Sequence, residues 1–288
     1  MIWVLFALAA GLTYCVQSEI NKHYKTDGFE LNTFRASIAT ILFLPALPLM
    51  EWPRIPEYYL VLLLEAAVSV VCMMAQYNLA AKKNGRIACL HQPIAILITF
   101  ALWLALSPEQ RQFFLDNPQN ALYVGIGFTL FIFSLFAVRK NDAGWLALMA
   151  VIPIAVLYSV MAVISKIALE HGENMLGISL NFVFLCNLLM LIMSLPLYLS
   201  RQKGRLHPPL STVKSSSGVA VFHSLSWLFY CLAVIGTPNP AYVGVITGLA
   251  PLWFLIYYKI RKHEDDASPM AGLVMGVAAI IVLIGANT

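Results

Sequence analysis

Charged residues are scarce in this sequence. Only 11% of its 288 residues are Asp, Glu, Lys or Arg, whereas soluble domains contain about 25%. These few charges gather in short runs, and the segments between the runs carry almost none. Hydrophobic residues make up 60% of the chain, and the mean hydropathy is +0.78. The composition excludes an ordinary soluble domain and predicts an integral membrane protein.

Metal-binding, disulfide and nucleotide-binding patterns are also absent from the sequence. Five cysteines fall inside apolar segments, at spacings typical of packing residues: Cys15, Cys72, Cys89, Cys186 and Cys231. No phosphate loop, dinucleotide fingerprint or metal-ligand motif occurs. The net charge of +4 is modest and lies in the loops. We therefore expect no cofactor, no use of ATP and no nucleic-acid partner.

Ten segments are long and apolar enough to cross a bilayer. They cover approximately 2–21, 30–50, 57–80, 87–107, 119–138, 144–168, 175–199, 216–235, 240–260 and 269–286. Each is about twice as long as a membrane β-strand, which favours helices over a barrel. The sequence therefore predicts an all-α membrane protein with ten transmembrane helices.

A weak internal repeat relates the two halves of the chain. Tyr14 and Tyr158 lie 144 residues apart, and so do Lys22 and Lys166. Five spans per half is an odd number, so the second half must enter the membrane from the opposite side. We therefore predict two inverted five-helix repeats, residues 1–142 and 143–288, around a central cavity. Secondary transporters of this design place their substrate site between the repeats.

Basic residues are distributed unevenly between the predicted loops. Fourteen lie on the side away from both termini, whereas only Arg54, Arg111 and Lys166 lie on the terminal side. Because cytoplasmic loops are enriched in Lys and Arg, this count places both termini outside the cell.

Several local patterns recur at matching places in the two halves. A Tyr-x-Leu-Ala…Ala…Pro pattern occurs from Tyr77 to Pro93, and Tyr230 to Pro251 repeats it more loosely. The first span has an aromatic residue, Tyr14, followed by Lys22, and the second span has Phe34-Arg35. Glycines occur in the fifth and tenth spans: Gly125, Gly127, Gly272 and Gly276. With these patterns, the whole chain resembles the drug/metabolite transporter superfamily, specifically its ten-helix EamA-like members.

The resemblance implies a basket of ten helices that exports or exchanges amino acids or similar metabolites across the plasma (inner) membrane. Helices one to four and six to nine would line the cavity, and helices five and ten would support it from outside. Two features depart from the family. Its members usually keep the N-terminus in the cytoplasm, opposite to the charge count, and many have Trp where this chain has Tyr14.

Glu65 is the most informative ionisable residue within a predicted span. At helical spacing it shares a face with Ser69, Cys72 and Gln76. A carboxylate inside a membrane is costly and usually faces a cavity or a partner. We expect Glu65 to bind an amine or a proton, with Gln76 beside it; the alternative is a structural carboxylate hydrogen-bonded to a neighbouring helix.

Further candidates come from the first two spans. Tyr14, Gln17 and Asn21 form one stripe, and Tyr158 begins the matching stripe of the second half. We expect both stripes to line the cavity, the alternative being ordinary helix packing. Arg35 could hold a substrate carboxylate or cap a neighbouring helix.

An aromatic and imidazole face completes the predicted binding set. His223 is aligned with Trp227 and Tyr230 along one span, and His91 lies near the start of another. Such a face suits a cation or a planar substrate, although buried packing would need the same residues.

Two prolines occupy matching places in the halves, at Pro93 and Pro251. A proline inside a helix removes a backbone hydrogen bond, so we expect both to kink their helices and to act as hinges.

These residues predict a secondary transporter that moves a small organic metabolite, such as an amino acid or amine, by alternating access. A coupling proton or counter-solute and membrane lipid are the other expected partners, and the protein would be a monomer or a homodimer. The alternatives are a proton-coupled multidrug or cation exporter and a lipid-handling membrane protein. We expect no enzyme, because only Glu65, His91 and His223 could supply an acid-base set.

Overall fold

The structure, a computed structural model, describes residues 2–82, 91–138, 145–201, 208–250, 252–253, 256 and 269–287, and within them it is all-helical. In chain order the elements are α1 (Ile2–Tyr24), α2 (Gly28–Phe43), the 3-10 helix η1 (Leu44–Leu49), α3 (Pro56–Lys82), α5 (His91–Leu106), α6 (Pro108–Asp116), α7 (Pro118–Val138), α8 (Trp145–Leu169), α9 (Met175–Arg201), α10 (Leu210–Ile235), α11 (Pro240–Thr247) and α13 (Pro269–Asn287).

In the part of the chain that the structure describes, six stretches of helix are long and apolar enough to cross a membrane: Ile2–Asn21, Gly28–Leu49, Pro56–Leu79, Val151–Leu169, Met175–Arg201 and Leu210–Ile235. A seventh is the pair α5 and α6, if this pair, bent by 97°, counts as one span. The chain is therefore a multi-pass integral membrane protein, as its composition indicates.

The helices differ from the predicted spans in several places. α11 ends at Thr247, whereas the predicted span that contains it reaches 260. The connection between the predicted spans 87–107 and 119–138 contains α6. Ser107 caps this helix by accepting a hydrogen bond from the Gln110 backbone N–H at 3.2 Å, and Pro108 begins it. This Ser-Pro start is a recognisable signature of a helix N-terminus. α10 begins at Leu210, earlier than the predicted start of its span at 216.

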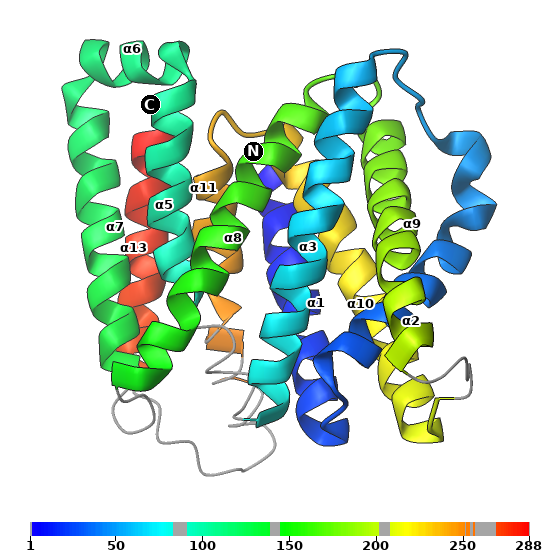
Figure 1. Cartoon of the computed structure of the whole chain (residues 1–288). Coiled ribbons are helices and arrows are strands. Elements are labelled where there is room, and N and C mark those ends of the chain that lie inside the picture. The colour runs from blue at the N-terminus through cyan, green and yellow to red at the C-terminus, as the bar shows by residue number, and fades with distance from the viewer. Residues whose placement is uncertain are drawn as a thin grey trace.

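The long helices alternate in direction along the chain (Figure 1). α1, α3, α7, α9 and α11 run from the upper end of Figure 1 to the lower end, and α2, α5, α8, α10 and α13 run back. Both chain termini lie in the upper part of this view.

Contacts between helices divide the molecule into a large bundle and a supporting pair. In the bundle, α1 packs on α10, α3 on α8, α2 on α9 and α5 on α8. α7 packs closely along α13 at one side. A Cβ added to Gly127 of α7 would lie 2.9 Å from the backbone nitrogen of Val282 in α13, so glycine is needed for this close approach.

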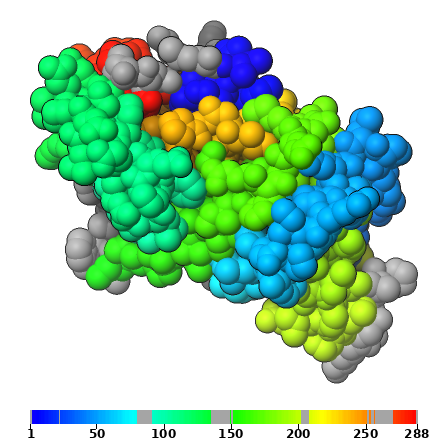
Figure 2. Space-filling model, turned by 90° about the horizontal axis from the view of Figure 1, so that it is seen from above, coloured from blue at the N-terminus to red at the C-terminus, as the bar shows by residue number. Residues whose placement is uncertain are grey.

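The view from above shows how the ends of the helices are arranged (Figure 2). The residues of α5 to α7 form one edge, and those around position 50 lie toward the opposite edge. The segment around position 240, where α10 is connected to α11, lies between these two edges.

Candidate functional site

A cavity of about 130 Å³ lies inside the bundle. Residues of six helices line it, namely α1, α3, α5, α8, α10 and α11. Eight of the residues predicted to bind substrate are in this lining: Tyr14, Gln17, Glu65, His91, Tyr158, His223, Trp227 and Tyr230. These eight come from five helices and from positions far apart in the sequence, so the fold is what gathers them.

Three predicted binding residues are outside the lining. Asn21 is buried and donates a hydrogen bond to the Tyr77 carbonyl at 3.1 Å, which ties α1 to α3. Gln76 contacts two lining residues, and Arg35 belongs to a separate cluster; both are described below.

Of the two predicted hinges, one is described. Pro93 lies close to the first described residue of α5 and is buried. α5 and α6 meet at a bend of 97°, which lies at the other end of α5 from Pro93. Pro251 lies outside the described residues. Shortly before it, α11 ends at Thr247, and the Leu249 N–H donates to the Ile246 carbonyl at 3.2 Å in a turn.

Glu65 lies in the middle of α3, and its side chain is completely buried. The hydroxyl of Ser165 donates a hydrogen bond to its Oε1 at 3.3 Å. Among the described residues its Oε2 has no hydrogen-bond partner, and neither does the hydroxyl of Ser69, one turn further along α3. No described Lys or Arg forms an ion pair with Glu65. A buried carboxylate in this state lacks most of the compensation that burial normally requires.

A second feature of the cavity is a hydrogen-bonded clasp of three side chains, Tyr14, Gln76 and Tyr158. The Gln76 amide nitrogen donates to the Tyr14 hydroxyl, and the Tyr158 hydroxyl donates to the Gln76 amide oxygen. The ring of His91 stacks on Tyr158 at a centroid distance of 4.2 Å. The clasp therefore joins α1 and α3 to α8, and the stack adds α5.

The imidazole of His223 is another part of the lining. Its Nδ1 is 2.9 Å from the Gln17 Oε1, which joins α10 to α1. The Trp227 ring lies edge-on to His223 at a centroid distance of 5.4 Å, and edge-on to Phe182 at 5.9 Å. These contacts fix the orientation of the indole at the cavity wall.

Arg35 is buried between α2 and α9 and is not part of the lining. Its guanidinium donates to the Asn187 Oδ1 at 2.9 Å, to the Asn32 Oδ1 at 3.0 Å, and to the Met190 sulfur at 3.5 Å. Neutral acceptors on its own helix and on α9 therefore hold the guanidinium, whose Nε has no partner among the described residues.

Lys166 is the nearest described cation in sequence to the lining residue Ser165, and its ammonium group is already bound. The group donates to the backbone carbonyls of Val234 and Thr237 at 3.1 and 2.9 Å. It also lies 3.3 Å from a carboxylate oxygen of Glu170. These contacts place Lys166 at the C-terminus of α10, where a cation interacts favourably with the helix dipole.

Four polar residues of the lining were missed as candidates: Gln92, Thr99, Ser226 and Thr247. The hydroxyl of Ser226 donates to the Ala10 carbonyl at 2.8 Å and that of Thr247 to the Gly244 carbonyl at 3.1 Å, as in ordinary helix packing. No motif or repeat in the sequence marked these four residues as candidates, although Gln92 is next to the candidate His91.

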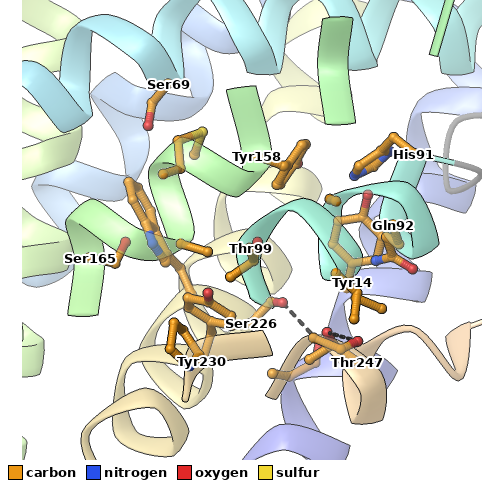
Figure 3. Close-up of a pocket in the computed structure, with 18 of the residues that line it drawn as sticks. Tyr14, Ser69, His91, Gln92, Thr99, Tyr158, Ser165, Ser226, Tyr230 and Thr247 are labelled. Carbon is orange, nitrogen blue, oxygen red and sulfur yellow. Dashed lines mark hydrogen bonds between the residues drawn. The ribbon is translucent and has the colours of Figure 1, made fainter. Parts of the chain in front are cut away.

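The close-up shows how the lining is arranged (Figure 3). Ser69 and Ser165 lie on one side of the cavity, His91 and Gln92 lie on the other, and Tyr158 and Thr99 lie between them. The lining thus has a carboxylate and hydroxyl end and an aromatic body. These groups can bind a solute by ion pairing, hydrogen bonds and cation–π contact. Within the described residues, no group of three or more His, Cys, Asp or Glu is placed to hold a metal ion.

Comparison with known proteins gives a fold but no function. No family model matches the chain, and no curated protein matches it. A solved structure described as "Crystal structure of protein" superposes with a TM-score of 0.67 at 14% sequence identity. The match covers 100% of this chain and 99% of that one, so the two share one fold over their whole length.

Proposed function

We propose that this protein is a secondary transporter of the EamA-like type that moves a small organic metabolite across the plasma membrane by alternating access. Its ten membrane-crossing helices would form two inverted five-helix repeats, with α1, α2, α3, α5 and α7 corresponding to α8, α9, α10, α11 and α13. The cavity between the repeats would be the substrate site.

Helix direction supports the inverted repeat. In each of the five corresponding pairs, one helix runs up and the other runs down in Figure 1. Contacts agree with this correspondence. α1 packs on α10 just as α8 packs on α3, and α5 packs on α8 just as α11 packs on α1. The pairs α2 with α9, α5 with α11 and α7 with α13 pack on each other, as elements near a two-fold axis would.

The composition of the cavity wall is the observation that carries the proposal. Its six helices are three corresponding pairs, α1 with α8, α3 with α10 and α5 with α11, so each half supplies three. Tyr14 and Tyr158, the matched residues of the sequence repeat, both face this cavity. A site built by two similar halves can open to either side when the halves exchange conformations.

The clasp contains a hydrogen bond between the two halves of the chain. Tyr14 and Gln76 belong to the first half and Tyr158 to the second, so the Gln76–Tyr158 hydrogen bond crosses the interface between halves. If the halves move against each other during transport, this contact must break and re-form in each cycle. The sequence carries no nucleotide-binding motif, so an ion gradient or solute exchange would drive the cycle.

A covalent lock across the clasp tests this proposal. Cells with and without the protein are first compared by untargeted metabolite profiling, and uptake of the accumulated or depleted solutes is then measured in proteoliposomes. The double variant Gln76→Cys with Tyr158→Cys, in a background without native cysteines, should transport before a short bis-maleimide is added and stop afterwards.

The matched control places both cysteines in one half, at Tyr14 and Gln76. Its cross-link should leave more transport, because it does not join the halves. Transport that is unaffected by the inter-half lock, or a protein that changes no solute, would contradict alternating access.

A further inference from the structure

We infer that the substrate is a small organic amine, which enters the cavity as a cation and places its ammonium group against Glu65, Ser69 and Ser165. This inference rests on the proposed function, because it specifies what the same cavity carries.

The described lining carries a single acidic side chain. Its residues include one carboxylate, that of Glu65, and no Lys or Arg. Oε1 of Glu65 accepts one hydrogen bond from Ser165, and Oε2 has no partner within the described parts of the chain. An ammonium group supplies the missing donors and the missing positive charge together. The cavity is therefore complementary to a cation and repels an anion.

Hydroxyl groups lie beside the carboxylate. Ser69 lies one turn from Glu65 on α3 and is fully buried, and no described residue is a hydrogen-bond partner of its hydroxyl. Figure 3 shows Ser69 and Ser165 on the same side of the cavity. Together with the free carboxylate oxygen, these groups offer acceptors to the several N–H donors of a primary ammonium. A quaternary ammonium has no N–H and would leave them unsatisfied.

Much of the rest of the lining is aromatic and apolar. The rings of Tyr158, Trp227 and Tyr230 belong to it, with Met73 and Met161. Aromatic faces attract organic cations and pack against hydrocarbon, whereas a bare metal ion needs a shell of oxygen ligands. The lining therefore favours an amine with an organic body over Na⁺ or ammonium ion.

The absence of Lys and Arg from the described lining favours an amine over a zwitterion. An amino acid also carries a carboxylate, which calls for a positive partner in the site. Arg35 is not in the lining and donates to Asn32, Asn187 and Met190. Lys166 is bound to two carbonyls and to Glu170. Neither Arg35 nor Lys166 lines the cavity, and the described lining contains no other Lys or Arg, so the carboxylate of a zwitterion would lie there without a cationic partner.

Solutes that share one skeleton and differ in charge test the inference. The purified full-length chain is titrated with 2-phenylethylamine, 3-phenylpropionate, phenylalanine and 2-phenylethanol, with butylamine and butyrate as a shorter pair, and with NaCl and NH4Cl as inorganic probes. The readout is the shift of the thermal unfolding midpoint with ligand concentration. At least one amine should stabilise the protein at concentrations where its matched carboxylate does not.

Variants then locate the contact. Glu65→Gln keeps the side-chain shape and should weaken amine binding about 100-fold, because it removes the charged partner. Ser69→Ala should weaken binding about tenfold through the loss of one hydrogen bond. The matched control is Glu57→Gln, which neutralises an exposed acid in the first turn of the same helix and should leave affinity unchanged. The midpoint without ligand verifies that each variant is folded.

Three outcomes would overturn the amine assignment: no amine binds, a carboxylate binds as well as its matched amine, or Glu65→Gln keeps full amine affinity. Transport separates this result from the proposed function. Transport of an anion through this cavity would support the proposed function and contradict the amine assignment. Amine binding through Glu65 without transport of any amine would support the amine assignment and contradict the proposed function.

Discussion

Glu65 and Arg35 are both completely buried in the helix bundle, yet their surroundings differ. Arg35, between α2 and α9, donates to two amide oxygens and a thioether, although its Nε has no partner among the described residues. Glu65, between α3 and α8, receives one hydrogen bond, and its other oxygen, beside a cavity, has no described partner. Burial of a charged residue in a membrane protein therefore does not by itself identify a binding site. The two differ because three side-chain acceptors hold the guanidinium away from the lining, whereas one hydroxyl holds the carboxylate at the cavity wall.

Substitutions at Arg35 and at Glu65 should change the stability of the protein in opposite directions. The larger change is expected at Arg35. Arg35→Met removes two hydrogen bonds from a charged donor and leaves the oxygens of Asn32 and Asn187 buried without it. Each such bond contributes about 1.5–3 kcal/mol, so unfolding should become easier by about 3–6 kcal/mol. The measurement is the unfolding midpoint in one detergent. An Arg35→Met protein of normal stability that has lost binding would make Arg35 a substrate residue instead.

Removal of the other charge should stabilise the protein. Glu65→Leu replaces a poorly satisfied buried carboxylate with an apolar group, so the free energy of unfolding should rise by about 1–3 kcal/mol while amine binding is lost. The same unfolding assay, run beside amine titrations, measures both effects. Destabilisation by Glu65→Leu would show that the carboxylate has a structural role like that of Arg35.

A smaller effect is expected at the clasp. Tyr14→Phe and Gln76→Leu each break the same hydrogen bond, so their effects on stability should not add. A double-mutant cycle should give a coupling of about 1 kcal/mol between them. The matched cycle with Tyr158→Phe should give a similar value, because Gln76 bonds both tyrosines. Additive effects in both cycles would show that these hydrogen bonds do not stabilise the protein.

The smallest effect belongs to an exposed acid on the same helix as Glu65. Glu57 lies in the first turn of α3, where a negative charge interacts favourably with the helix dipole. Glu57→Gln should therefore lower the free energy of unfolding by less than about 1 kcal/mol and should not change amine affinity. A large loss of affinity in this variant would mean that long-range charge, rather than the Glu65 contact, attracts the amine.

Much of the helical framework could be predicted from the sequence, because apolar runs separated by charged loops are strong signals. The predicted span 144–168, for example, coincides closely with α8, Trp145–Leu169. The polar stripe of Glu65 and Ser69 was also predictable from helical spacing, as was the pair Tyr14 and Tyr158 from the repeat. That these residues bind substrate stays a prediction.

Contacts between distant residues could not be predicted. Gln17 meets His223 from 206 positions away, and Arg35 meets Asn187 from 152. Such pairs depend on which helices pack together, which the local pattern of one helix does not specify. For the same reason the sequence left Arg35 open between substrate binding and a structural role.

Alternating access requires the cavity beside Glu65 to open in turn to each side of the membrane. Ser69→Cys, in a background without native cysteines, places a thiol in that cavity, and membrane-impermeant maleimide can be applied to proteoliposomes from outside or trapped inside. The account predicts labelling from each side, with both rates reduced by a saturating amine. Labelling from one side only, whatever the solute, would contradict it.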